Sequence, residues 1–482
     1  MHSLRPSVLL RSVTCLVLLV LAMATPPAHA YSVLTHEQLI DLTWDASIVP
    51  LLRSRYPNLT AAELEQARAY AYGGCVIQDI GYYPFGDAFF SNLTHYVRSG
   101  DFVVNLFRNA QNANELAFAV GALSHYIGDN VGHATATNLA VPVEFPKLAD
   151  RYGRSVNYAQ GTHQHVRVEF AFDVNEIVHH RLAPVHYLRH VGLEVATRQL
   201  SLAFYQTYGI RADFSSRRKK RINVGGYRFS VRSFLPRIAY AVTVLHRRKS
   251  PPETDSDDLR KLDTEITAVA QKNNWDAYRK NAGIGTYMLA GVLWVLPKWG
   301  PISMVSVKGP TTDTETEYVH SVLVSTDRLN AALRRFTPPP ATVTSLSAAN
   351  APVPTVAPAA LSTAPASERR GTRNPPDPQH PLANRDLDTG VVVRPGGYPL
   401  TDETFCRLAH TLAADPTLAI PPGIKKEVLG YYANMDLPFA TRKHADAWKQ
   451  LQADLVVLQG MPTSTEPEPY PTFGDPEPDD ED

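Results

Sequence analysis

Apolar residues recur at helical spacing along most of residues 31–208, and this pattern predicts a mainly α-helical domain. Two helix starts are marked by their sequence: Thr60 precedes Glu63 by three residues, which forms a capping box, and Pro184 suits a first helical turn. The pattern predicts helices at residues 36–47, 61–74, 101–109, 112–137, 159–182 and 184–208.

The segment 79–95 interrupts this pattern with glycines and aromatic side chains, and we expect a loop there. Its aromatics either line a substrate pocket or, as is more common, form core. Further along the chain, helices are expected at 259–271 and 317–336. The apolar run 284–297 contains two glycines and ends at a proline, which indicates a buried helix rather than a membrane span.

Both ends of the chain differ in composition from this body. A basic start and an apolar run at 13–23 precede the small-residue signal Ala28-His29-Ala30, which is typical of a secretory signal peptide covering residues 1–30. The apolar run is shorter than the roughly 20 residues that span a bilayer. The sequence therefore predicts export, to the periplasm or the cell exterior, of a mature chain that begins at Tyr31.

The second half predicts a linker and a smaller helical unit. Residues 31–336 form the expected main domain, and residues 337–397 are crowded with Pro, Ala, Thr and Ser, which predicts a disordered linker. A small helical module follows at 398–460, without a cluster of metal-ligating residues. The tail 461–482 is acidic and rich in proline, and we expect it to be disordered.

Charge and cysteine content exclude few classes of function. The formal net charge is zero. The body left after removal of the acidic tail and the signal peptide is mildly basic, and this charge is too weak to indicate nucleic-acid binding. The basic clusters 217–221 and 247–249 could touch anionic phospholipid, but no amphipathic anchor adjoins them, which favours solvated loop ends. Cys75 and Cys406 either pair or stay free, with Cys75 as a small buried hydrophobe.

Candidate chemistry begins with a stripe of three residues on the expected helix 112–137. His125, Asp129 and His133 are spaced i, i+4, i+8, so they share one helix face. Two imidazoles and a carboxylate are ligands typical of zinc. Taken alone, the stripe is equally compatible with a polar helix face, so the other ligands decide the interpretation.

A second pair of candidate ligands lies on the expected helix 159–182. His165 and Glu169 are again four residues apart. His163 is a poorer candidate because its i+4 neighbour is Arg167, a cation that a metal site disfavours. The patch of His179, His180, His186 and His190 lacks an acidic partner at matching spacing, and we expect it to lie outside the site.

With Asp79, His95 and His36, these residues resemble the ligand pattern of the zinc-dependent phospholipase C family. That superfamily includes the S1/P1-type single-strand nucleases and the N-terminal domain of glycosylphosphatidylinositol-specific phospholipase D. The resemblance covers about residues 31–208 and implies a multi-helix fold with two to three zinc ions. Tyrosine stands at the mature N-terminus where these proteins usually have tryptophan. Three residues, rather than five, separate Asp129 from His133, which resembles the phospholipase D-type branch and favours a phospholipid substrate.

The resemblance also implies which residues hold each metal. Asp79, His95, His125 and Asp129 would hold the first zinc, and His133, His165 and Glu169 the second. The Tyr31 amino group and carbonyl, with His36, would hold the third, which Asp129 bridges to the first. Asp79 would also orient a water molecule or accept its proton.

Three functions are compatible with these residues, in order of preference. The first is a secreted zinc phosphodiesterase of phospholipase C type that acts on phospholipid and contacts the membrane surface peripherally. The second is a single-strand nuclease or other phosphodiesterase with the same cluster. The third is a non-catalytic, metal-stabilised helical binding protein. Structural zinc sites are closed to water, which places this third function last.

Overall fold

The computed structural model describes residues 32–83, 86–212, 214, 224–246, 255–279, 284–295, 309–336 and 382–464. Within these residues the chain is helical, with two isolated β-bridges and no longer strand, so the expected mainly α fold is confirmed. The expected signal peptide, Tyr31, both basic clusters, residues 337–381 and the tail beyond residue 464 lie outside the described residues.

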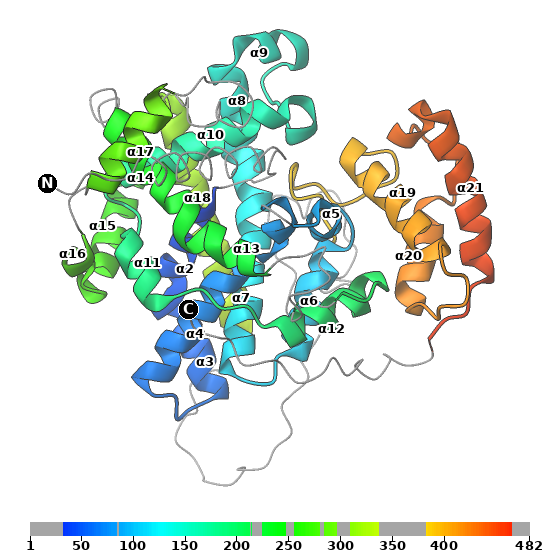
Figure 1. Ribbon diagram of the computed structural model, residues 1–482, viewed down its shortest axis with the longest axis horizontal. Helices are drawn as coiled ribbons and strands as arrows, with labels where there is room; N and C mark the ends of the chain where they lie inside the picture. Colours follow the sequence, from blue (N-terminus) through cyan, green and yellow to red (C-terminus); the bar gives the residue numbers. More distant parts are fainter. Residues whose placement is uncertain are drawn as a thin grey trace, which may run out of the picture.

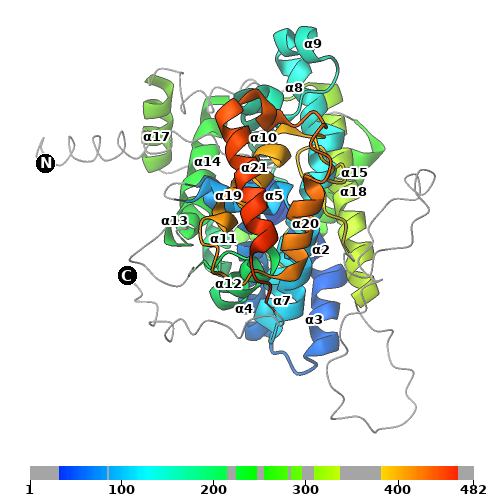
Figure 2. The same ribbon diagram turned by 90° about the vertical axis from the view of Figure 1, so that its right-hand side faces the viewer.

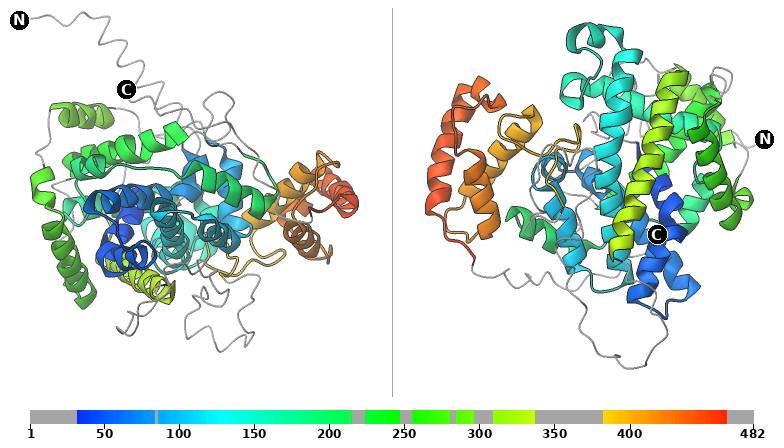
Figure 3. Two further views of the ribbon diagram at one scale, coloured as in Figure 1. Left: turned by 90° about the horizontal axis from the view of Figure 1, so that it is seen from below. Right: turned by 180° about the vertical axis from the view of Figure 1, so that it is seen from behind.

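Helix α7 (Ala113–Gly132) is the central element of the fold (Figure 1). It contacts α2 (Val33–Thr43), α4 (Ala61–Gly74), α6 (Ser99–Asn109) and α18 (Thr312–Phe336). The rear view in Figure 3 places α18 alongside it. Gly121 permits the close approach of α4, since a Cβ atom there would lie 2.3 Å from the Ala71 carbonyl oxygen. This helix therefore brings residues from both ends of the main domain to one axis.

The remaining helices of the main domain surround this axis. The C-terminal end of α7 continues into the π-helical turn η3 (His133–Thr137), and α10 (Tyr158–Val178) lies beside both it and α2. The others include η1 (Trp44–Ile48), α3 (Val49–Arg55), α8 (Asn138–Glu144), α9 (Pro146–Tyr152), α13 (Val224–Phe229), η4 (Ser230–Phe234), α14 (Leu235–His246), α15 (Asp257–Lys272) and α16 (Trp275–Tyr278).

Two expected elements have a different form. The segment 79–95, expected as a loop, contains η2 (Ile77–Tyr82) and α5 (Ala88–Tyr96), because Asp87 caps α5 by accepting from the Phe89 amide. The single helix expected at 184–208 is two helices, α11 (Val185–Val191) and α12 (Thr197–Tyr208). The break occurs at Gly192, whose φ of +90° ends α11.

The apolar segment expected as a buried helix is helical but not buried. Helix α17 (Ile284–Val295) packs on α14 and buries Ala290 and Leu293, whereas Met288 is 61% exposed and Trp294 73% exposed. Composition predicted the helix but could not reveal that only one face is covered. No helix in the described ranges combines the length and the apolar character that a bilayer crossing requires.

The C-terminal module consists of α19 (Pro399–Ala413), α20 (Pro422–Tyr431), η8 (Ala440–Lys443) and α21 (Ala445–Gly460). It lies on the α5 side of the main domain, where α19 contacts α5 (Figures 1 and 2). Cys75 and Cys406 are both free.

The segment 382–397, expected to belong to the disordered linker, is folded against the main domain. Leu382 and Leu387 are fully buried, and Arg385 forms a bridge with Val392. The expectation was wrong here because the order comes from contacts with residues more than 250 positions earlier, such as the bond from Tyr126 Oη to the Ala383 carbonyl oxygen (2.6 Å). The hydrophobic periodicity of a segment carries no information about such long-range contacts.

Candidate metal centre

Asp129, on α7, lies at the centre of three imidazoles. Its Oδ1 atom is 3.3 Å from His36 Nε2, and its Oδ2 atom is 3.0 Å from His125 Nε2 and 3.4 Å from His95 Nε2. All four side chains are at most 1% exposed. These donors come from α2, α5 and α7, so the helix packing described above creates the cluster.

A second donor group adjoins the first and shares His125 with it. Asp79, on η2, places its Oδ1 atom 3.3 Å from His95 Nε2 and 4.0 Å from His125 Nε2. The ligand atoms of Asp79, His95 and His125 all lie within 4.8 Å of one another, as do those of His36, His125 and Asp129. Two cations could therefore lie close together, with His125 and Asp129 between them.

Backbone carbonyls orient two of these imidazoles. His95 Nδ1 donates to the Ser91 carbonyl oxygen (2.7 Å), and His125 Nδ1 donates to the Cys75 carbonyl oxygen (3.1 Å). With Nδ1 bonded to the backbone, the Nε2 atom of each ring points into the cluster. This arrangement is typical of metal-ligating histidines, whose other ring nitrogen bonds a carbonyl or carboxylate group.

The third donor group joins the end of α7 to α10. His133, His165 and Glu169 have ligand atoms within 4.8 Å of one another, and the rings of His133 and His165 stack with centroids 4.8 Å apart. His165 Nδ1 lies 2.7 Å from Glu169 Oε1, and its Nε2 atom lies 2.8 Å from Asn138 Oδ1. A cation bound here would replace the His165–Glu169 hydrogen bond.

Burial and mutual charge shift the pKa values of these groups. Burial lowers the pKa of His133 to about 3 and that of His165 well below its usual value, so both rings are neutral. Burial opposes protonation of His95 too, but hydrogen bonds with Asp129 and Asp79 raise its pKa to about 10. Burial, then repulsion by Asp129 and Asp79, raises the pKa of Glu169. Nearby positive charge would stabilise the carboxylates.

The donor set fits zinc. Both His133 nitrogens and Glu169 Oε2 make no hydrogen bond within the described residues, although all are buried. Buried polar atoms normally have a partner, and one left without it requires an explanation such as an ion. Imidazole nitrogens and carboxylate oxygens are the ligands zinc accepts in proteins.

The structure brings together eight of the nine residues that the sequence singled out as ligands: His36, Asp79, His95, His125, Asp129, His133, His165 and Glu169. The ninth, Tyr31, lies outside the described residues. His163 is exposed on α10, and His190 is exposed beside Glu65, so neither belongs to the centre.

Sequence reasoning missed Asp173, which holds the start of α2. Its carboxylate accepts from the amides of Leu34 and Thr35 (3.1 Å each) and from the Thr35 hydroxyl (2.7 Å). It thereby caps α2 and fixes His36, the next residue along the chain, against the cluster. The available signal was its position four residues after Glu169, on the same face of α10.

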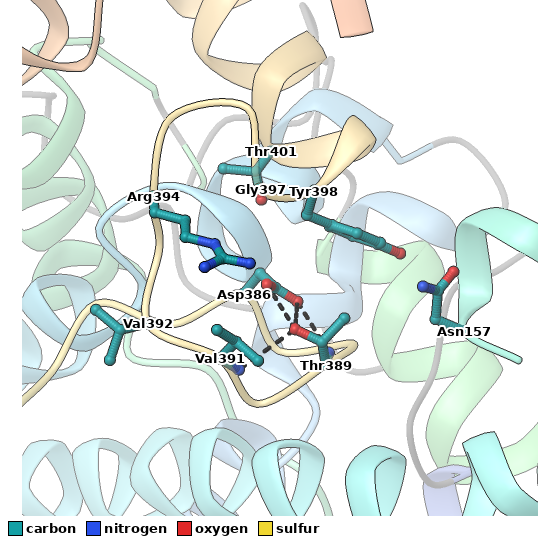
Figure 4. Close-up of a pocket in the computed structure, with 9 residues that line it drawn as sticks. All are labelled: Asn157, Asp386, Thr389, Val391, Val392, Arg394, Gly397, Tyr398 and Thr401. Atoms are coloured by element: carbon teal, nitrogen blue, oxygen red, sulfur yellow. Dashed lines mark hydrogen bonds between the residues drawn. The ribbon is translucent and has the colours of Figure 1, made fainter. Parts of the chain in front are cut away.

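It also missed Asp388, a buried carboxylate from the C-terminal half. Asp388 Oδ1 lies 3.7 Å from His133 Nε2, and burial raises the pKa of Asp388 to about 7. Its chain neighbours Asp386 and Thr389 line a pocket of about 130 Å³, together with Asn157, Tyr398 and others (Figure 4). No sequence pattern connects residue 388 to a ligand stripe more than 200 positions earlier.

Comparison with known proteins agrees with the geometry. The family model described as zinc dependent phospholipase C matches residues 35–215, which is less than half of the chain. The match contains all eight donor residues from His36 to Glu169. Comparison with curated proteins and with solved structures gave no match. The match over residues 35–215 therefore supports membership of the zinc-dependent phospholipase C family.

Proposed function

We propose that the chain is a secreted, zinc-dependent phosphodiesterase of phospholipase C type that hydrolyses phospholipid and uses two to three zinc ions. The observation that carries the proposal is the set of three adjoining donor groups around Asp129, buried from solvent and built on the family segment. Export rests on the signal-peptide pattern of residues 1–30.

The chain's own residues would divide the chemistry among them. Bound zinc would supply a water of lowered pKa, near 7, and positive charge against the phosphate. Asp129 would fix the spacing of two cation positions, since its two oxygens face different histidines. Asp79, adjacent to His95 and His125, would orient the attacking water or accept its proton.

A phospholipid is favoured over a nucleic acid as substrate. The spacing of Asp129 and His133 resembles the phospholipase D-type branch of the superfamily. The aromatics of residues 79–95 do not favour a base-stacking platform, since Tyr82, Tyr83, Phe89 and Phe90 are each at most 7% exposed and serve as core. The single-strand nuclease remains the second candidate.

The exposed face of α17 supports contact with a lipid surface. Met288, Trp294 and Val295 are each more than 60% exposed on this helix. It packs on α14, which carries the exposed Arg237. Burial, and then the charges of Arg237 and Arg232, lower the pKa of Arg189. Apolar side chains beside clustered cations are typical of peripheral binding to anionic membranes.

Parallel assays on two substrates test the proposal. We expect the purified mature protein to release phosphorylated headgroup from phosphatidylcholine vesicles, and to cleave single-stranded DNA far more slowly. Faster DNA cleavage would select the nuclease instead. Bound zinc without either activity would select the metal-stabilised binding protein. A chelator-treated sample, restored with zinc, controls for a contaminating hydrolase.

A further inference from the structure

Asp388 lies in a segment that the family match does not include, yet it faces the metal centre. Its side chain is 1% exposed, and its Oδ1 atom lies 3.7 Å from His133 Nε2. Its Oδ2 atom accepts hydrogen bonds from the hydroxyls of Tyr96 (2.9 Å) and Tyr398 (2.6 Å). The two tyrosines therefore bind one oxygen and leave the other toward the histidine.

The backbone around Asp388 is hydrogen-bonded to His95 and, through the side chain of Asn138, linked to His165. The Leu387 amide donates to the His95 carbonyl oxygen (3.1 Å). Asn138 Nδ2 donates to the Asp388 carbonyl oxygen (2.8 Å), while the Oδ1 atom of the same amide is 2.8 Å from His165 Nε2. The position of Asp388 is thus set by the residues that make up the centre.

The third donor group has one protein ligand fewer than a four-coordinate zinc site. His133, His165 and Glu169 provide three protein donors, whereas zinc in proteins is usually four-coordinate. Two donors about 2.1 Å from one tetrahedral ion lie roughly 3.4 Å apart, and slightly farther at wider angles. The 3.7 Å between Asp388 Oδ1 and His133 Nε2 fits a shared ion.

We propose that Asp388 is a further ligand of the metal held by His133, His165 and Glu169, supplied by the segment 382–397, which lies outside the family match. The inference rests on the proposed function only in that the centre holds zinc. It has a structural consequence: the metal would fasten the segment 382–398, and with it α19, to the family domain. The metal position of the third donor group would then lack one ligand in a protein truncated before residue 382.

A pair of substitutions in one turn tests the assignment. Asp388→Asn preserves size and can still accept from Tyr96 and Tyr398, but removes the negative charge. Asp386→Asn is the matched control, because Asp386 is also buried (4% exposed) and bonds Thr389 within the turn, as Figure 4 shows.

We expect wild type and Asp386→Asn to bind equal numbers of zinc ions in chelator competition. Asp388→Asn should lose one ion or bind it at least about 10-fold more weakly, since even residues that only support a ligand change metal affinity by 10–100-fold. Unchanged zinc binding in Asp388→Asn overturns the ligand role, whatever the phosphodiesterase activity of the variant. Equal weakening in both variants also overturns it and assigns the effect to the fold of the turn.

A second measurement needs no variant. In the wild-type protein, removal of zinc should increase amide hydrogen exchange within residues 382–398, and zinc should restore protection. Unchanged exchange in this segment contradicts the inference. A wild-type protein that binds no zinc would contradict the proposed function. If the wild type is active and binds zinc, and Asp388→Asn binds zinc equally well, only the inference about Asp388 is contradicted.

Discussion

Asp129 lies one helical turn beyond His125 on α7, and its Oδ2 atom is 3.0 Å from His125 Nε2. Its other oxygen faces His36, on α2, at 3.3 Å. One carboxylate therefore belongs to a donor group that extends from the central helix to the start of the described chain. Its loss should affect more of the centre than the loss of any single histidine.

Replacing Asp129 with asparagine is the first test of this arrangement. Asp129→Asn should lower zinc content and reduce phosphodiesterase activity by more than about 100-fold, because the effect of losing a ligand should exceed the 10–100-fold effect of residues that merely support one. His36→Ala should be milder, since it removes one donor. His163→Ala, exposed on α10, is the control and should match wild type. An active, zinc-replete Asp129→Asn protein would refute the central role of Asp129.

The mature N-terminus provides a second prediction, which derives from the family resemblance. A protein that retains one extra residue before Tyr31 should lose one zinc ion and most of its activity, because its α-amino group no longer lies at the ligand position. Metal analysis and turnover of the two forms, both tagged at the C-terminus, provide the comparison. Equal zinc content and equal turnover would show that the N-terminal amine is not a ligand.

Zinc affinity should increase with pH between about 6 and 8. In the metal-free centre the pKa of His95 is raised to about 10, so this ring is protonated at neutral pH and must release its proton when zinc binds. Burial raises the pKa of Glu169, so this carboxyl group also favours zinc binding at higher pH. His133, with a pKa lowered to about 3, is already neutral and contributes nothing.

Each proton released should strengthen zinc binding by up to about tenfold per pH unit. Chelator competition at pH 6, 7 and 8, corrected for protonation of the chelator, measures the slope. An affinity that does not vary over this range would mean that the centre binds zinc without displacing a proton.

The exposed face of α17 predicts the behaviour of the protein on vesicles. Trp294→Ala should weaken sedimentation with anionic phospholipid vesicles by roughly 10-fold, since burial of a large apolar side chain contributes about 1.5–3 kcal/mol. Turnover of a short-chain, water-soluble substrate should not change. Val456→Ala removes a comparably exposed apolar side chain (69%) from α21 and should leave vesicle binding unaltered. Identical sedimentation of all three proteins would exclude α17 as the contact surface.

Local sequence patterns predicted those parts of the fold and of the metal centre that short-range helical geometry determines. The stripe His125, Asp129 and His133 and the pair His165 and Glu169 could be read from spacing, because helical geometry alone places them on one face. The Thr60 capping box lies at the start of α4 as expected. Each of these features is determined by residues within two or three turns of one another.

Features that depend on distant contacts could not be read this way. Asp79 and His95 were recognised only through the family resemblance, since a single acid or histidine at a loop end carries no pattern. Asp173 and Asp388 were missed because their partners, Thr35 and His133, lie 138 and 255 positions away. The exposure of α17 depends on which neighbours cover it, which composition does not specify.

Zinc content of the purified mature protein, measured by elemental analysis after dialysis against metal-free buffer, tests the central claim most directly. The three donor groups and the family assignment predict two to three zinc ions per chain, with phosphodiesterase activity that is lost on chelation and regained with zinc. A folded protein that contains no zinc and binds none on addition would contradict the account.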